Sequence, residues 1–398
     1  MTAPPPPTSA DGGRRLAALV AAGLVDSLCL SVAWTLLVLR VAEVHGLPAV
    51  GLCSAAMLVG VALSAPVAGR MARWLDGRLL LRTAAGAEMV LRAAVVGLVL
   101  GDAPVLLVAL CVGAMNLTAW TGYAGMRAEV AAARPGASAL TWYGSLVAAA
   151  EAAGVALAAL LPLGPEARDL VLAVVTCSYV LSLVPTVVVA GRSPVPRAAA
   201  PARHWGRVDL SPPVLVGGGL MLLASGPTLL FVALTEELHG RTAVAAAAIA
   251  FTAGSLLAPV VAGALQRRAA AGSGTWAVVA AGMVAGWVVA PVSVVLLCGA
   301  QLLSGVCLTL LEGLLDNAAA DRHPERVTGA LASATAGRAL GSAAATATLP
   351  LLLGGTSLGV VALVLAAVLV GVAVAIARRS RSGRAVVPRA RRLKPAVG

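Results

Sequence analysis

Charged and aromatic residues are both scarce in this chain. Only 12% of the 398 residues are charged and 3% are aromatic, whereas 60% are hydrophobic and the mean hydropathy is +0.94. An ordinary soluble domain carries about 25% charged and about 45–50% apolar residues. So many apolar side chains could not be hidden in one soluble core, so the composition excludes that class. It predicts an integral membrane protein.

Histidine, lysine and paired cysteines are scarce as well. The four histidines are scattered, and the six cysteines lie in apolar segments without a Cys-x-x-Cys pair. We therefore expect no metal site, no disulfide framework and no cofactor. The absence of a phosphate-binding Walker sequence argues against an ATP-driven motor in this chain. The net charge of +12 comes from basic residues without interleaved aromatic residues, so no nucleic-acid partner is expected.

Long apolar runs bounded by charged residues, proline or glycine predict twelve membrane-spanning helices. A span needs about 20 apolar residues, and only a helix satisfies its own backbone over that length. The expected spans are 16–39, 48–69, 79–100, 103–125, 138–161, 169–190, 213–234, 243–265, 275–290, 292–315, 328–350 and 357–377. The fold class is therefore all-α. The predicted organisation is a disordered terminus (1–15), a six-helix bundle (16–190), a basic linker (191–211), a second bundle (212–377) and a basic tail (378–398).

Basic residues lie almost entirely on one side of these spans. The other side holds three of them: Arg40, Arg168 and Arg241. Two more, Arg92 and Arg338, lie within the spans. The positive-inside rule then places both termini in the cytoplasm of a cell membrane. The arginine-rich tail is expected to contact the lipid surface.

An internal repeat divides the chain into halves. Ala65-Pro66-Val67-Ala68-Gly69-Arg70 is matched by Ala258-Pro259-Val260-Val261-Ala262-Gly263, 193 residues later. A second match joins Glu151-Ala152-Ala153-Gly154 to Arg338-Ala339-Leu340-Gly341. Each half contains an even number of spans, so the halves enter the membrane with the same orientation. They are predicted to be parallel repeats, as in two-halved transporters.

At this point the chain resembles the major facilitator superfamily over residues 15–378. The resemblance rests on the topology, the basic middle loop and a degraded signature after the second span. Gly69 fits that signature, Arg73 and Trp74 replace its Asp-Arg, and Asp76-Gly77-Arg78 supplies an acid only after a shift. The second copy keeps Gly263, Arg267 and Arg268 without an acid. The resemblance implies that this loop holds the halves together in the outward-open state. Here the gating contact is expected to be weak or built differently.

Six charged residues lie within the predicted spans, where each costs roughly 2.5–3.5 kcal/mol on insertion scales. They are Asp26, Glu88, Arg92, Glu151, Glu312 and Arg338. Glu88 and Arg92 are i,i+4 neighbours and read as a neutralised pair, or Arg92 pairs with Asp26 instead. For Asp26, proton or cation coupling, a structural ion pair and a helix–helix hydrogen bond all stay open.

The two charges at equivalent positions of the repeats, Glu151 and Arg338, have three interpretations. They pair across the halves, bind opposite ends of a substrate, or brace their own halves. Glu312 lies near a span end and is expected to reach the cytoplasmic surface. With four acids against two bases, at least one carboxyl is predicted to be protonated or coupled to a cation.

The resemblance implies a central cavity, and four polar or aromatic residues lie where its lining would be; a break in one helix is predicted as well. Asn116, Thr118 and Trp120 cluster in the fourth span, and Trp34 lies in the first. Ser225-Gly226-Pro227 predicts a kink in the seventh.

The leading hypothesis is a monomeric secondary transporter, not an enzyme, which exports a small molecule by alternating access using a proton or cation gradient. Uptake by the same fold is the first alternative. A polytopic membrane enzyme or lipid-handling protein is the second, and a receptor or assembly partner is the third. Beyond the substrate and the coupling ion, membrane lipids are the only partner expected.

Overall fold

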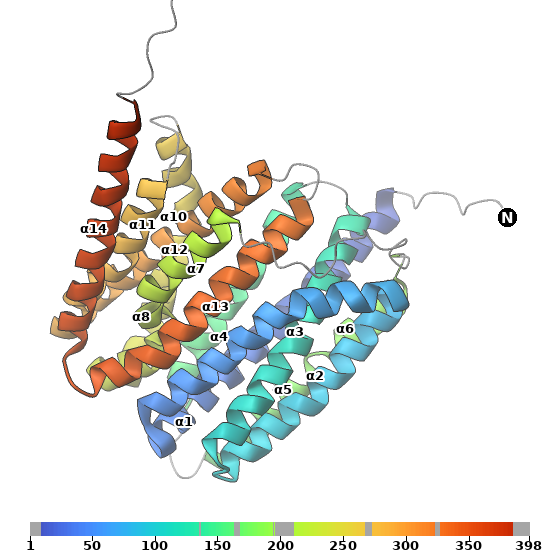
Figure 1. The fold of residues 1–398 in the computed structure, drawn as a ribbon. Coiled ribbons are helices and arrows are strands. Elements are labelled where there is room, and N and C mark those ends of the chain that lie inside the picture. Colours follow the sequence, from blue (N-terminus) through green and yellow to red (C-terminus); the bar gives the residue numbers. More distant parts are fainter. Residues whose placement is uncertain are drawn as a thin grey trace, which may run out of the picture.

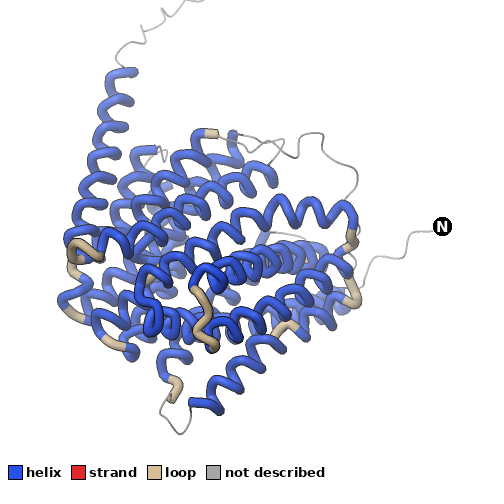
Figure 2. The backbone as a smooth tube through the Cα atoms, turned by 60° about the horizontal axis from the view of Figure 1, so that its bottom comes forward, coloured by secondary structure: helices blue, strands red, loops and turns tan. Residues whose placement is uncertain are grey.

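The computed structural model describes residues 9–134, 137–162, 168–193, 195, 211–266, 273–322 and 327–384. Throughout these residues the chain forms helices, turns and bends, with no strand (Figure 2). The all-α prediction is therefore confirmed. Nine of the described helices are long and apolar enough to cross a membrane, judged by length and composition. The first of them is 66 residues long and kinked, so the count of twelve spans stays a prediction.

The first half of the chain forms one group of helices. Its members are α1 (Ser9–Trp74), α2 (Gly77–Leu100), α3 (Val105–Ala133), α4 (Ala137–Leu160), α5 (Arg168–Leu181) and α6 (Val184–Ala190). Within α1, Gly46 has φ 78° and ψ 175°, a left-handed conformation that favours glycine. This residue divides α1 into two arms, which match the first two predicted spans.

The second half forms the other group. Its α-helices are α7 (Pro212–Ala224), α8 (Gly226–Leu229), α9 (Phe231–His239), α10 (Arg241–Gln266), α11 (Ser273–Ala285), α12 (Val294–Arg322), α13 (Val327–Leu353) and α14 (Leu358–Arg384). Two short 3₁₀ turns, Gly286–Val288 and Ala290–Val292, follow α11. The break predicted at Ser225-Gly226-Pro227 lies between α7 and α8.

Two described segments near the ends are helical where none was expected. Residues 9–15, predicted as part of a disordered terminus, belong to α1, and Arg15 within it is paired with Glu129 of α3. Residues 378–384, predicted as part of the tail, extend α14.

The two ends of the helix bundle are named here after one residue at each. The Gly46 end holds the α1 kink and the α2–α3 turn, and also Gly240, where α9 meets α10. The Asp76 end holds the α1–α2 turn and also the start of α4 and the end of α3. By the charge pattern of the sequence, the Asp76 end is predicted to be cytoplasmic.

The internal repeat reappears in the packing of glycines. A Cβ atom added to Gly154 would lie 2.6 Å from the carbonyl oxygen of Leu28, so α4 touches the backbone of α1. At the matching position, Gly341 of α13 approaches the carbonyl oxygen of Gly218 in α7 in the same way. Gly60 against α3 and Gly254 against α12 form a second matched pair. The two halves therefore share not only a sequence pattern but also the contacts that hold each half together.

The two groups meet along α1 with α13 and along α4 with α10 (Figure 1). A Cβ on Gly51 would lie 2.8 Å from the Cγ atom of Pro350, and Ala62 is packed with Ala339 nearer the middle of the helices. Gly51 lies five residues after the Gly46 kink, so the tightest of these contacts is near the Gly46 end.

Candidate functional site

A guanidinium buried at the centre of the first helix group holds two carboxylates. Arg92 of α2 is 0% exposed. Its Nη1 atom lies 2.8 Å from Oδ1 of Asp26 on α1, and its Nη2 atom lies 2.5 Å from Oε1 of Glu88 one turn earlier on α2. Both acids that the sequence offered as partners of Arg92 are thus its partners. One positive charge faces two acidic groups.

Two residues of the next helix segment complete the site, which we call the Arg92 cluster (Asp26, Glu88, Arg92, Tyr179, Ser182). Nη1 of Arg92 donates to the carbonyl oxygen of Tyr179 at 2.7 Å and to Oγ of Ser182 at 2.8 Å. The guanidinium carbon lies 4.6 Å from the centre of the Tyr179 ring, a cation–π distance. Ser182 also donates to Oδ1 of Asp26 at 2.9 Å.

The helical segment that carries Tyr179 and Ser182 is interrupted at these residues. Ser182 and Leu183 separate α5 from α6. The carbonyl of Tyr179, near the end of α5, is therefore free to accept from a side chain of another helix. Sequence reasoning missed both residues. The hydroxyl of Ser182 within a predicted span was a usable signal, whereas the backbone carbonyl of Tyr179 offered none.

Glu151 lies near the Arg92 cluster. It is three residues before Gly154 on α4, so both residues are on the face of α4 that contacts α1. Its side chain is exposed, and it interacts electrostatically with Asp26 and with Tyr123 and Tyr143. A carboxylate exposed to lipid within a membrane span would be strongly unfavourable, so we expect the accessible space beside Glu151 to hold water or substrate.

Aromatic rings form a short stack beside Glu151. The rings of Tyr123 and Tyr143 are stacked with centroids 6.0 Å apart, and the Trp120 and Tyr123 rings form a T-shaped pair with centroids 5.4 Å apart. Arg127 lies 6.0 Å above the Tyr123 ring. Trp120 is 40% exposed, so part of this stack is accessible. The arrangement offers an apolar face next to an acid.

The second helix group has its own charged site, the Arg338 cluster (Glu312, Asp316, Arg338). Nη1 of Arg338 lies 2.6 Å from Oδ1 of Asp316, and Nη2 donates to Thr335 at 3.4 Å. Glu312, one turn before Asp316 on α12, interacts with both of these charges. The structure thus pairs Arg338 with Asp316 within its own half and not with Glu151. The expected span 292–315 ended just before Asp316, whereas α12 continues to Arg322.

The other predicted cavity residues divide into packed and accessible ones. Asn116 is 8% exposed and donates to the carbonyl of Val112, and Thr118 donates to the carbonyl of Met115. Trp34 is packed against the main apolar core. Among the four candidates, Trp120 has the most open side chain. Asn116 and Thr118 satisfy their own helix.

The predicted gating loop does not bridge the two groups in the described residues. Gly69 and Arg73 lie within α1, and Asp76 caps the start of α2 by accepting from the backbone amide of Leu79 at 2.8 Å. Arg78 is exposed. Gly263 lies in α10, while Arg267 and Arg268 lie outside the described residues.

A buried acid that sequence reasoning missed lies next to this loop. Glu129 of α3 is 1% exposed and accepts from Arg15 and from Ser193. The amide of Gly77 donates to the carbonyl of Val195 at 3.0 Å. These contacts bind Ser193 and Val195 of the linker (191–211) to α3 and to the start of α2. Glu129 therefore connects parts of the first half to one another.

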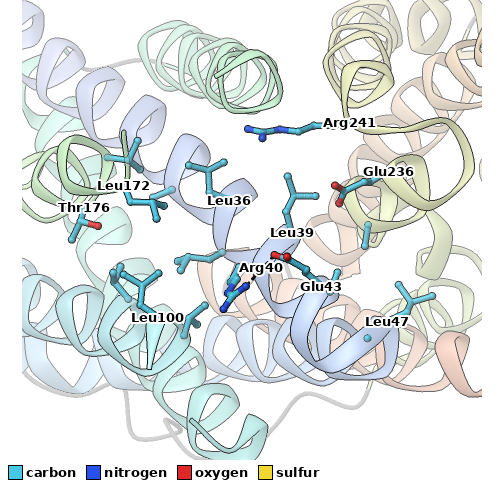
Figure 3. A pocket seen from close by; sticks show the side chains of 18 of the residues that line it. Leu36, Leu39, Arg40, Glu43, Leu47, Leu100, Leu172, Thr176, Glu236 and Arg241 are labelled. Atoms are coloured by element: carbon cyan, nitrogen blue, oxygen red, sulfur yellow. Dashed lines mark hydrogen bonds and ion pairs between the residues drawn. The ribbon is translucent and has the colours of Figure 1, made fainter. Parts of the chain in front are cut away.

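A cavity of about 660 Å³ lies at the Gly46 end, between the two groups (Figure 3). Leu36, Leu39 and Leu172 give it an apolar wall. Charged side chains surround the rest: Arg40, Glu43, Glu236, Glu237 and Arg241. Arg40 pairs with Glu43 at 3.2 Å and with Asp102 at 3.1 Å.

Solved transporter structures share this architecture. A nucleoside transporter, NupG, matches with a TM-score of 0.66 and 12% identity, over 91% of this chain and 98% of its own. A bacterial homologue of the iron transporter ferroportin, in an inward-facing state, matches with a TM-score of 0.62 and 18% identity, over 91% and 98%. The xylose transporter XylE from E. coli, in an inward open conformation, matches with a TM-score of 0.67 and 13% identity, over 91% and 94%.

No protein-family model matches the sequence, and no curated protein does. The structural likeness nevertheless establishes the fold, which is that of major facilitator transporters. The fold implied by the sequence resemblance is thereby confirmed. It is the fold of a multi-pass membrane protein, in line with the nine apolar helices.

Proposed function

We propose that this protein is a secondary transporter that exports a small molecule across the cell membrane in exchange for protons. The substrate would lie between the two helix groups, which expose it to one side of the membrane and then to the other. The fold supports transport, and the Arg92 cluster carries the proposal of proton coupling. There, two carboxylates share one guanidinium, so binding of a single proton balances the charge.

Asp26 is the acid that exchanges the proton in this proposal. Its side chain is 23% exposed, whereas that of Glu88 is 4% exposed, so a proton reaches Asp26 more easily. When Asp26 is neutralised, Arg92 keeps the Glu88 carboxylate as its counter-charge. The proton therefore loosens the contact between α1 and α2 without leaving a buried charge unpaired. This change would bias the packing of α1, which also contacts the second group.

Glu151 and its aromatic neighbours are the proposed substrate-binding site, next to the Arg92 cluster. The acid attracts a cationic group, and the Trp120–Tyr123 edge offers an apolar surface. A small, fairly apolar or cationic compound fits this combination. Because Glu151 interacts electrostatically with Asp26, a bound cation and a proton on Asp26 would disfavour each other. Mutual exclusion of this kind is what exchange requires.

Proteoliposomes with an imposed pH gradient test the proposal, with ethidium as the apolar cationic probe. The wild-type protein should move ethidium against the proton flow. Asp26→Asn should lose gradient-driven transport but keep ethidium exchange at equal pH, and Glu151→Gln should lose both. Glu43→Gln, an acid of the Gly46 end paired with Arg40, is the matched control and should retain transport. Unchanged gradient-driven transport in Asp26→Asn would contradict the proposed coupling. Ethidium moving with the protons would favour uptake over export.

A further inference from the structure

The structure contains a polar contact that joins the two helix groups. Nη2 of Arg241, the first residue of α10, donates to the carbonyl oxygen of Ala158 at 2.5 Å. Ala158 is 0% exposed and lies two residues before the end of α4. The last carbonyls of a helix carry negative partial charge and lack partners within the helix, so a guanidinium there is favourable.

Backbone geometry positions Arg241 for this contact. Gly240, immediately before it, has φ 81°, a conformation that favours glycine and turns the chain sharply from α9 into α10. The guanidinium is thereby directed across the boundary between the groups, and Figure 3 shows it at the edge of the cavity at the Gly46 end. Its Nε atom is buried and makes no hydrogen bond. The arginine is held in place mainly by the Ala158 carbonyl.

An acid on each group extends the connection. Glu236 of α9 interacts electrostatically with Arg241 and with Glu43 of α1. Figure 3 shows Glu236 between the labelled Arg241 and Glu43 side chains. The two acids repel each other across the boundary unless the positive charge of Arg241 stays beside them. Removing Arg241 therefore does more than delete one hydrogen bond, because two acids then face each other with less compensation.

We infer that Arg241 stabilises the closed state of the Gly46 end. Its bond to Ala158 holds α10 of the second group against α4 of the first, and this bond must break before the two groups separate at that end. We call this contact the latch. The inference rests on the proposed function in one respect, because a latch matters only if the two groups move. The close contact of Gly51 with Pro350 supports the same closed end. A charged hydrogen bond that is made in one state and broken in the other shifts their balance by its net free energy, because both groups bind water once it breaks.

Distances between spin labels test the latch without any substrate. One pair of labels is placed at the Gly46 end on exposed residues of each group, Leu106→Cys and Val292→Cys, which are 62% and 75% exposed. A second pair is placed at the Asp76 end, Trp74→Cys and Arg322→Cys. The six native cysteines are replaced by alanine in all variants. Arg241→Ala should raise the ratio of open to closed populations at the Gly46 end roughly tenfold or more. The Asp76 pair should become closer in the same variant.

Arg40→Ala is the matched control, because Arg40 lines the same cavity but pairs only with Glu43 and Asp102 of its own group. It deprives Glu43 of a counter-charge but keeps the bond between Arg241 and Ala158, so any shift toward the open state should be much smaller than in Arg241→Ala. Arg241→Gln keeps donors but loses the charge, and should give an intermediate shift; it provides the measurement if Arg241→Ala does not fold. Unchanged distances in the folded Arg241 variant, or the same shift in Arg40→Ala, would overturn the inference. A shift in a protein that shows no ethidium flux would refute the proposed function and leave the latch standing.

Discussion

Replacing Arg92 by methionine should be the most damaging single change in the first helix group. Methionine fills a similar volume but removes the only positive charge that contacts Asp26 and Glu88 in the Arg92 cluster. It also leaves the Tyr179 carbonyl and the Ser182 hydroxyl without their donor. Breaking a buried ion pair by removing one partner costs about 3–5 kcal/mol. We expect a loss of at least that size, because two acids share the arginine.

Removing both carboxylates together with Arg92 tests whether the lost stability comes from the uncompensated negative charge. In the triple variant Asp26→Asn, Glu88→Gln, Arg92→Met, no carboxylate remains at the site, so most of the lost stability should return. Thermal unfolding of detergent-purified protein at neutral pH, followed by fluorescence, measures both differences. Arg127→Met, which removes an exposed arginine of α3, serves as the control and should change stability by less than about 1 kcal/mol. An Arg92→Met protein as stable as the wild type would refute the reasoning, and so would a triple variant no more stable than Arg92→Met.

Two further predictions concern contacts described above. Gly154→Val and Gly341→Val should each destabilise the protein by about 1–3 kcal/mol in the same thermal assay, because a side chain at either site meets the backbone of a neighbouring helix. Gly86→Val, at a site with open space around it, should change stability much less, and equal losses at all three sites would count against the packing argument. Glu129→Gln should loosen the start of the linker (191–211) from α3, since the buried acid binds both Arg15 and Ser193. Limited trypsin cleavage near Arg192 should then become faster than in the wild type, and an unchanged cleavage rate would contradict this anchoring role.

The fold could be predicted from the sequence because the patterns that indicate it run along the chain. The apolar runs and the repeated Ala-Pro-Val sequence need no knowledge of which helices touch. Gly154 and Gly341 were recognised as equivalent by spacing alone, and the structure shows the same backbone contact at both. The pairing of Glu88 with Arg92 was also accessible, because residues four apart on one helix must lie on one face.

The partners across helices could not be predicted in the same way. An error of one residue turns a side chain by about 100° around its helix, so neighbours on other helices remain undetermined. For Arg338, pairing with Glu151, substrate binding and a brace within its own half all stayed open, and the structure shows Asp316 of the neighbouring helix as its partner. Tyr179 contributes a backbone carbonyl, which every residue has and no sequence pattern marks.

The matched glycine contacts determine which parts of this molecule can move. Where α4 touches α1 through Gly154, and α13 touches α7 through Gly341, backbone meets backbone with no side chain between them to change rotamer. Such helix pairs resist sliding, so we expect each half to move largely as a unit. Most of a change of shape should then be taken up in the seam between the halves, where α1 meets α13 and α4 meets α10. Substitutions in that seam should alter the rate and balance of opening, whereas substitutions at the glycines should alter whether the bodies form at all.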